Sequence, residues 1–193
     1  MYQPLSFQIT GVSPLLMHNG RLADPLDPLV KDIKKLSSKR PKTEADLGQM
    51  AKLEFLGSLY LHGGEPCLPG ELIEAALIDG AKRKRRGPLA KAGILCDGNI
   101  PLRYEGPREP EALWDDGRFR FRTGVRVERL RVMRVRPRFN DWSAAVTIQF
   151  MPSLLSKDDV WDIIRTCQCR LDTGSSALCV MPVAPDARDE HMR

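Results

Sequence analysis

Nine arginines fall within 21 consecutive residues, and most of them alternate with apolar residues. They are Arg118, Arg120, Arg122, Arg126, Arg129, Arg131, Arg134, Arg136 and Arg138. Successive side chains of a β-strand point to opposite faces, so this alternation predicts a half-buried strand or hairpin over residues 118–139. The apolar residues between the arginines are expected to face a core, namely Phe119, Phe121, Val125 and Val127. The arginines would then form a row on the other face.

A row of guanidinium groups repels itself unless an anionic and repetitive partner lies along it, and a phosphate backbone is such a partner. Glu128 is the one acidic residue within the row. The alternative is a solvated strand face whose arginines pair with acids outside the row, such as Glu105, Asp115 or Asp116. The alternation also shifts near Glu128 and again at Val132-Met133, which predicts a bulge or a turn inside the segment.

The positive charge is concentrated rather than spread along the chain. The whole chain has a formal net charge of +5, whereas residues 118–138 alone carry about +8, so the remainder is slightly acidic. This distribution favours a dedicated anionic partner. A second basic run follows a predicted helix and consists of Lys82, Arg83, Lys84, Arg85 and Arg86. Basic residues in the last turn of a helix also interact favourably with its dipole, so this run has an ordinary structural explanation as well.

The sequence predicts neither a cofactor nor a metal site. Its five cysteines lack paired C-x-x-C spacing, and its three histidines, His18, His62 and His191, lie far apart in the chain. The G-x-x-x-x-G-K-[ST] spacing of phosphate-binding loops does not occur. No window has the roughly 18 consecutive apolar residues that a membrane helix needs, and no signal peptide is visible. We therefore expect a cytoplasmic protein with reduced cysteines and no membrane partner.

Strands and helices are expected to alternate irregularly along the chain. Periodicity predicts an opening strand at Leu5, Phe7 and Ile9, and a strand at residues 145–150. Helices are predicted over residues 44–60, from Gly70 onward and over residues 156–167. The polar residues 18–42 are predicted to form an inserted flap with a short helix at residues 29–36, and residues 107–114 a loop.

This order of elements favours an α+β fold with a β-α-β-β-α-β, ferredoxin-like core, an inserted flap and an arginine-rich hairpin. We expect one domain over residues 1–181, with the flap inserted at about residues 18–42. The remaining residues, 182–193, are polar and proline-containing and are predicted to be disordered.

Two stretches resemble the RAMP superfamily, the repeat-associated proteins that form the backbones of CRISPR effector complexes. Residues 9–16, ITGVSPLL, are similar to the opening strand of that family, which often ends in the phrase TPL. Residues 68–77, LPGELIEAAL, resemble the segment IPGSSLKGALR that begins the first core helix of the family. The resemblance implies an RRM-like, ferredoxin-type core that binds single-stranded nucleic acid and often polymerises along it.

The chain departs from the family near its C-terminus, where a glycine-rich loop is usual. The matching residues 172–176, DTGSS, contain a single glycine. Either the chain is a divergent relative or its C-terminal part has been altered, for example by a shifted reading frame. The length of the chain is compatible with a stand-alone relative encoded by a phage or another mobile element.

Together these patterns predict non-catalytic binding of single-stranded RNA or DNA, by a homo-oligomer or a subunit of a ribonucleoprotein. The nine arginines would contact phosphates, with help from residues 82–86. Aromatic residues make up 6% of the chain, and Phe119 and Phe121 have the parity of the core. Phosphate contacts should therefore outweigh base stacking, which predicts little sequence specificity.

Two other functions stay open at this point. Asp24 and Asp27 lie in two Asp-Pro pairs that are similar to the Asp-bearing loop with which some RAMP backbone subunits cleave RNA. This would make the chain a metal-independent endoribonuclease, although Asp before proline is also a common turn residue. The second alternative is a protein whose basic face docks on an acidic protein. His18 is either an active-site base or a structural histidine, and Trp142 either stacks on a base or packs in the core.

Overall fold

A computed structural model describes residues 1–127, 130–167 and 180–183 of the chain. The fold is mixed α+β with several antiparallel sheets, as the sequence predicts. The chain divides into two compact units. We call the first, formed by Met1–Leu15, Cys67–Glu105 and Asn140–Arg193, the sheet unit. The second, formed by Leu16–Pro66 and Gly106–Phe139, is the hairpin unit.

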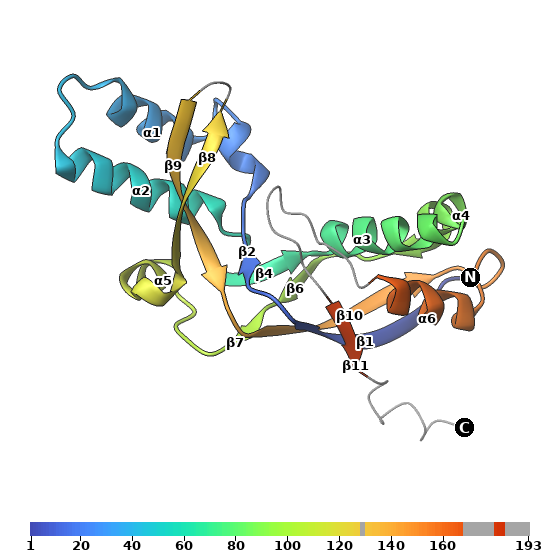
Figure 1. The fold of residues 1–193 in the computed structure, drawn as a ribbon. Helices are drawn as coiled ribbons and strands as arrows, with labels where there is room; N and C mark the ends of the chain where they lie inside the picture. The colour runs from blue at the N-terminus through green and yellow to red at the C-terminus, as the bar shows by residue number, and fades with distance from the viewer. Residues whose placement is uncertain (128–129, 168–179, 184–193) are drawn as a thin grey trace. The chain divides into compact units, whose positions relative to one another are not determined.

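The sheet unit contains an antiparallel sheet with the strand order β11-β1-β10-β5 (Figure 1). Its strands are β1 (Gln3–Gly11), β5 (Ile94–Leu95), β10 (Trp142–Phe150) and β11 (Val180–Val183). The short strand β7 (Arg103–Tyr104) also pairs with β10. The predicted opening strand and the predicted strand at residues 145–150 are therefore both confirmed.

One face of this sheet is apolar and covered by helices. Leu5, Phe7 and Ile9 of β1 are buried, and each is opposite a buried residue of β10. The helices of this unit are α3 (Gly70–Arg83), α4 (Gly87–Gly93) and α6 (Lys157–Thr166). Phe7 contacts Trp161 of α6 edge-on, with 6.4 Å between the ring centroids. Burial of alternate β1 side chains explains why the sequence shows period two there.

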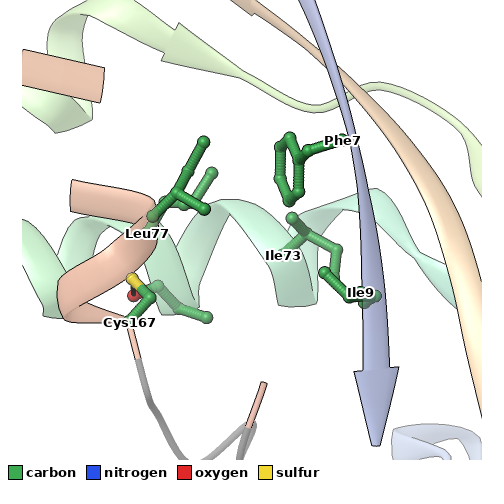
Figure 2. Close-up of a pocket in the computed structure, with 7 residues that line it drawn as sticks. Phe7, Ile9, Ile73, Leu77 and Cys167 are labelled. Atoms are coloured by element: carbon green, nitrogen blue, oxygen red, sulfur yellow. Dashed lines mark hydrogen bonds between the residues drawn. The ribbon is translucent and has the colours of Figure 1, made fainter. Parts of the chain in front are cut away.

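A small apolar cavity remains between the sheet and two of these helices, with a volume of about 20 Å³. Figure 2 shows Phe7 and Ile9 on the strand side, Ile73 and Leu77 on α3, and Cys167 just after α6. The Cys167 thiol donates a hydrogen bond to the Ala76 carbonyl at 3.0 Å. An apolar lining of this kind offers no partners to a water molecule.

Helix α3 begins at a glycine because the backbone approaches closely there. A Cβ atom on Gly70 would lie 2.0 Å from the carbonyl oxygen of Cys96. The Gly70 amide donates to the carbonyl of Gly98 at 2.7 Å, which fixes this approach. Strands β4 (Glu65–Pro69) and β6 (Asn99–Pro101) pair beside it. The Pro69-Gly70 step in the sequence thus has a steric cause.

The hairpin unit is built around β8 (Arg120–Val127) and β9 (Leu130–Phe139), which pair antiparallel as predicted (Figure 1). Strand β2 (Leu15–Leu16) pairs with the other edge of β9, and β3 (Leu61–His62) pairs with the start of β4. The helices are α1 (Pro28–Ser38), α2 (Glu44–Ser58) and α5 (Pro110–Asp115), with two short 3-10 helices, η1 (Gly20–Ala23) and η2 (Gly117–Phe119).

Helix α2 starts with a complete capping box. Thr43 accepts from the Asp46 amide, and Asp46 accepts from the Thr43 amide, so two unpaired donors of the first turn are satisfied. The helices predicted over residues 44–60 and 29–36 are confirmed as α2 and α1. The predicted loop over residues 107–114 is wrong, because α5 begins at Pro110. Proline at a first helical position has the right φ, and the buried Leu113 anchors the turn.

The prediction of one domain over residues 1–181 stays a prediction, and residues 18–42, which the sequence predicts to form an inserted flap, belong to the hairpin unit. The predicted tail overlaps β11 at residues 182–183, and residues 184–193 lie outside the described residues. Residues 172–176, which match the glycine-rich loop of the RAMP family, also lie outside them. Within the described residues, no helix is both long and apolar enough to cross a membrane.

We expect Gly70→Ala to destabilise the protein by about 1–3 kcal/mol, because the new methyl group must displace backbone rather than a flexible side chain. The matched control is Gly48→Ala in α2, where a Cβ would have no neighbour within 4 Å. That change should stabilise by roughly 0.5–1 kcal/mol through helix propensity. Urea unfolding measures both, and equal effects at the two positions would contradict the steric explanation.

Asp46 should make the free energy of unfolding of the hairpin unit depend on pH in the acidic range. Hydrogen bonds from Lys39 and Thr43 lower the pKa of its carboxyl from 3.8 to about 2. A depressed folded-state pKa stabilises the folded state above pH 3.8, and this contribution is lost as the pH falls toward about 2. The difference in urea midpoint between the wild type and Asp46→Asn should therefore shrink between about pH 5 and pH 2. Asp32→Asn is the charge-matched control, and a difference that is independent of pH would refute the assignment.

Candidate functional site

The register of the hairpin decides where each arginine points. Arg120 pairs with Pro137, Arg122 with Val135 and Arg126 with Arg131, in an unbroken series. The bulge or turn predicted inside the segment corresponds to the reversal of the chain between β8 and β9, and Val132 and Met133 keep regular partners on β8. The alternation shifts in the sequence because Arg131 has the parity of one face of the hairpin, whereas Arg134 has the parity of the other face. Glu128 and Arg129 lie outside the described residues.

The arginines divide between the two faces of the hairpin. Residues that pair across antiparallel strands share a face, so even-numbered residues of β8 share a face with odd-numbered residues of β9. Arg120, Arg122 and Arg126 therefore lie on one side, which we call the Arg122 face. Arg134, Arg136 and Arg138 lie on the other, the Arg136 face. The prediction of a single row is wrong, because it assumed that both strands present their arginines with the same parity.

The Arg122 face is open to solvent along β8. Arg120, Arg122 and Arg126 are all exposed. The Arg120 guanidinium lies 5.0 Å from the centroid of the Trp114 ring, which packs edge-on against Phe55. Within the described residues, Arg122 forms no ion pair. Arg131 pairs with Arg126 and so has the register position of this face, but its side chain lies outside what the structure describes.

Arg118, just before β8, is exposed but engaged. Its Nη2 lies 2.7 Å from Oδ2 of Asp116, and its Nε donates to both carboxylate oxygens at 3.1 Å. These hydrogen bonds hold the pKa of Asp116 below its ordinary value. Arg118 therefore pairs with a neighbouring acid, which is the alternative that the sequence left open.

The Arg136 face is turned toward α2 and is mostly covered. Arg136 is 9% exposed, and its burial lowers the pKa of the guanidinium. Arg134 forms an ion pair with Glu54 of α2, and Glu54 also accepts from the Val135 amide at 3.2 Å. The Arg138 guanidinium lies over the Phe121 ring, 5.4 Å from its centroid. These arginines pack against the protein, so they are not part of an open row.

His18 lies beside this cluster. Its Nδ1 atom is buried and has no hydrogen-bond partner among the described residues, although the residue as a whole is half-buried. Burial and then the charges of Arg136 and Arg134 lower the pKa of the imidazole, while Glu54 opposes them. The lowered pKa favours the neutral imidazole, and Nδ1 has no hydrogen-bond partner in the part of the chain that the structure describes. Sequence patterns gave no sign that Glu54, an ordinary helical residue, would join this group.

The basic run at the end of α3 is largely paired with acids of the sheet unit. Lys82 contacts Asp79 at 2.7 Å, Lys84 contacts Asp162 at 3.0 Å, and Arg86 pairs with Asp159. The last two pairs link α3 to α6, so they have a structural role. Within the described residues, Arg83 and Arg85 form no ion pair. This run belongs to a different unit from the hairpin.

Asp24 and Asp27 are both committed to local structure. Asp24 accepts from the Leu26 amide at 2.8 Å, as in an ordinary Asx turn. Asp27 caps α1 by accepting from the Leu29 amide at 2.8 Å, and its Oδ2 lies 2.8 Å from Arg21. Partial desolvation raises the pKa of Asp27, but the bonds from Arg21 and Leu29 outweigh it and lower the pKa overall. These contacts favour the turn explanation over a catalytic one.

The remaining candidates pack in the sheet unit. Trp142 is 3% exposed and donates from Nε1 to the Ser13 carbonyl at 3.1 Å, so it is a core residue. Cys67, Cys96 and Cys167 are buried. Burial raises the pKa of the Cys96 thiol to about 11, which makes it a poor nucleophile. No group of three His, Cys, Asp or Glu side chains in the described part of the chain could share a metal ion.

Neither the protein-family models nor the curated proteins include a match to this chain.

Asp27→Ala should lower the urea midpoint, because it removes the cap of α1 and the partner of Arg21. The control is Asp32→Ala on the same helix, which removes an exposed pair with Lys35 that is worth a few tenths of a kcal/mol. If Asp27 were catalytic instead, the wild type would cleave RNA and Asp27→Ala would not. If Asp27→Ala unfolds no more easily than Asp32→Ala, the structural assignment is wrong.

Proposed function

We propose that this protein binds single-stranded nucleic acid through phosphate contacts made by the Arg122 face of the hairpin. The observation that carries the proposal is the presence of Arg120, Arg122 and Arg126 on one exposed face of a single strand. A strand rises by about 3.3 Å per residue, so Arg120 and Arg122 lie about 7 Å apart along β8 and Arg126 lies about 13 Å beyond Arg122. Guanidinium groups bind phosphate oxygens in a bidentate way, which suits a backbone of repeated anions.

The order of elements in the sheet unit supports a ferredoxin-like core. Apart from α4 and the short strands β4, β6 and β7, the elements follow as β1, α3, β5, β10, α6 and β11, and the sheet order is β11-β1-β10-β5. We infer a β-α-β-β-α-β core in which the last strand pairs with the first. The hairpin unit then consists of two insertions, one between β1 and α3 and one between β5 and β10.

Such a core agrees with the resemblance of residues 9–16 and 68–77 to the RAMP superfamily. The resemblance favours a single strand over a duplex as the ligand. It also favours assembly of several copies along the strand, or a place in a ribonucleoprotein.

The packing narrows the set of arginines that serve the proposed contacts. Arg120, Arg122 and Arg126 are central, and Arg118 joins them once its bond to Asp116 is exchanged for one to phosphate. Arg134 and Arg136 are engaged on the other face, and Lys82, Lys84 and Arg86 are paired with acids. Contacts to phosphate carry no information about the bases, so binding is expected to show little preference for nucleotide sequence.

The test measures affinity for fluorescent RNA and DNA strands of about 30 nucleotides, and for duplex DNA, at several salt concentrations. Arg122→Gln should weaken binding to all single strands alike and reduce the slope of log affinity against log salt by about one. The matched control is Arg165→Gln on α6, an exposed arginine with the same loss of charge, which should bind as the wild type does.

Two results would overturn this function. An unchanged salt slope in Arg122→Gln would exclude a phosphate contact at that residue. If the wild type failed to bind any strand at low salt, the Arg122 face would instead be a docking surface for an acidic protein.

A further inference from the structure

His18 is held rigidly between β9 and the end of α2. The amide of Met17 donates to the Pro137 carbonyl at 3.1 Å, and the amide of Asn19 donates to the Ser58 carbonyl at 3.1 Å. The Tyr60 hydroxyl donates to the carbonyl of His18 itself at 3.2 Å. Bonds on both sides of the residue fix its backbone, so the buried Nδ1 is not the result of a loose segment.

The charges that act on this imidazole are those of Arg136, Arg134 and Glu54, two positive and one negative. The electrostatic field at the ring is therefore net positive. The ring is half-buried, so solvent screens this field poorly. A buried polar atom without a partner is rare in a native protein and commonly marks the place of a bound ion or water. Both features are what an anion would relieve.

Glu54 already occupies the position of an anion on this face of the hairpin. One carboxylate oxygen accepts from the Arg134 guanidinium, and the other accepts from the backbone amide of Val135 at 3.2 Å. These two donors converge on one oxyanion-sized group. An external phosphate that replaced Glu54 would find the same donors, with Arg136 and His18 beside them.

We propose that His18, Arg134 and Arg136 form a second phosphate-binding site, on the Arg136 face of the hairpin, which Glu54 occupies in the absence of ligand. The ligand is a phosphodiester group of the strand that the Arg122 face binds, so the inference rests on the proposed function and extends it to the opposite side of the hairpin. Glu54 acts as an internal competitor that must leave before the phosphate enters.

Binding at this site should take up a proton. In the free protein, burial and the two arginines hold the pKa of His18 below its ordinary value of 6.5. A phosphate between the arginines offsets their charge and accepts a hydrogen bond from the ring, so both effects raise the pKa. Affinity should therefore increase as the pH falls from about 7.5 to about 5.5. By linkage, a rise of one unit in the pKa gives up to about a tenfold gain in affinity.

The experiment follows the His18 imidazole by NMR on protein labelled with ¹⁵N-histidine. The chain has three histidines, so His18→Gln identifies the His18 signal, and His62 and His191 serve as internal controls. The wild type is titrated with pH in the absence and presence of dimethyl phosphate, a diester whose charge is constant over this range. A separate arm uses inorganic phosphate, and sodium chloride keeps the ionic strength equal throughout.

We expect dimethyl phosphate to move the His18 titration to higher pH and to leave the other two histidines unchanged. In Glu54→Gln the competitor has lost its charge, so the half-saturating concentration of dimethyl phosphate should fall by roughly threefold or more. The circular dichroism spectrum checks that this variant is folded, and the wild-type titration tests the site without any variant.

An unchanged His18 titration with dimethyl phosphate in both proteins would overturn the site. A response to inorganic phosphate alone would overturn the diester assignment and indicate a free phosphate or a phosphomonoester instead. These failures are distinguishable from failure of the proposed function, which is judged by the salt slope of Arg122→Gln on long strands.

Discussion

The antiparallel pairing of β1 with β10 is the constraint on which the sheet unit depends. It joins Gln3 to Phe150 and continues through eight successive residue pairs to Thr10 and Ser143. This register puts the apolar residues of both strands on the same side, where α3 and α6 cover them. A shift of one residue would turn that whole set to solvent, so burial itself selects the register. The chain segment that connects β1 to β10 therefore has to start and end at this strand pair.

The hairpin depends on its register in the same way, with a consequence for charge rather than for burial. Each residue of β8 is paired so that the two strands present opposite sequence parities on one face. Arginines that look equivalent in the sequence therefore differ in environment. Arg122 is exposed to solvent, whereas Arg136 is buried and has a lowered pKa. The Arg122 face is open to solvent along β8, whereas Arg134 on the Arg136 face is paired with Glu54.

Local signals in the sequence predicted the local structure well. The Thr43 capping box, the apolar periodicity of β1 and the alternation over β8 and β9 each act over a few residues, and each appears in the structure. The division of arginines between two faces could not be predicted, because it depends on pairing between strands. The Glu54 contacts depend on how α2 packs against β9, which no spacing in the sequence encodes. Pairing of Lys84 and Arg86 with α6 was hidden for the same reason.

The position of β8 at the edge of its sheet has one more consequence. Within the described residues, β9 is its one neighbour, so the other edge of β8 has backbone donors and acceptors without strand partners. Exposed edges of this kind tend to pair with the edge of another molecule, and closely spaced like charges oppose such pairing. The arginines of β8 would therefore oppose pairing between the β8 edges of two copies. A polyanion that neutralised these arginines would weaken this repulsion and would favour the approach of two copies edge to edge.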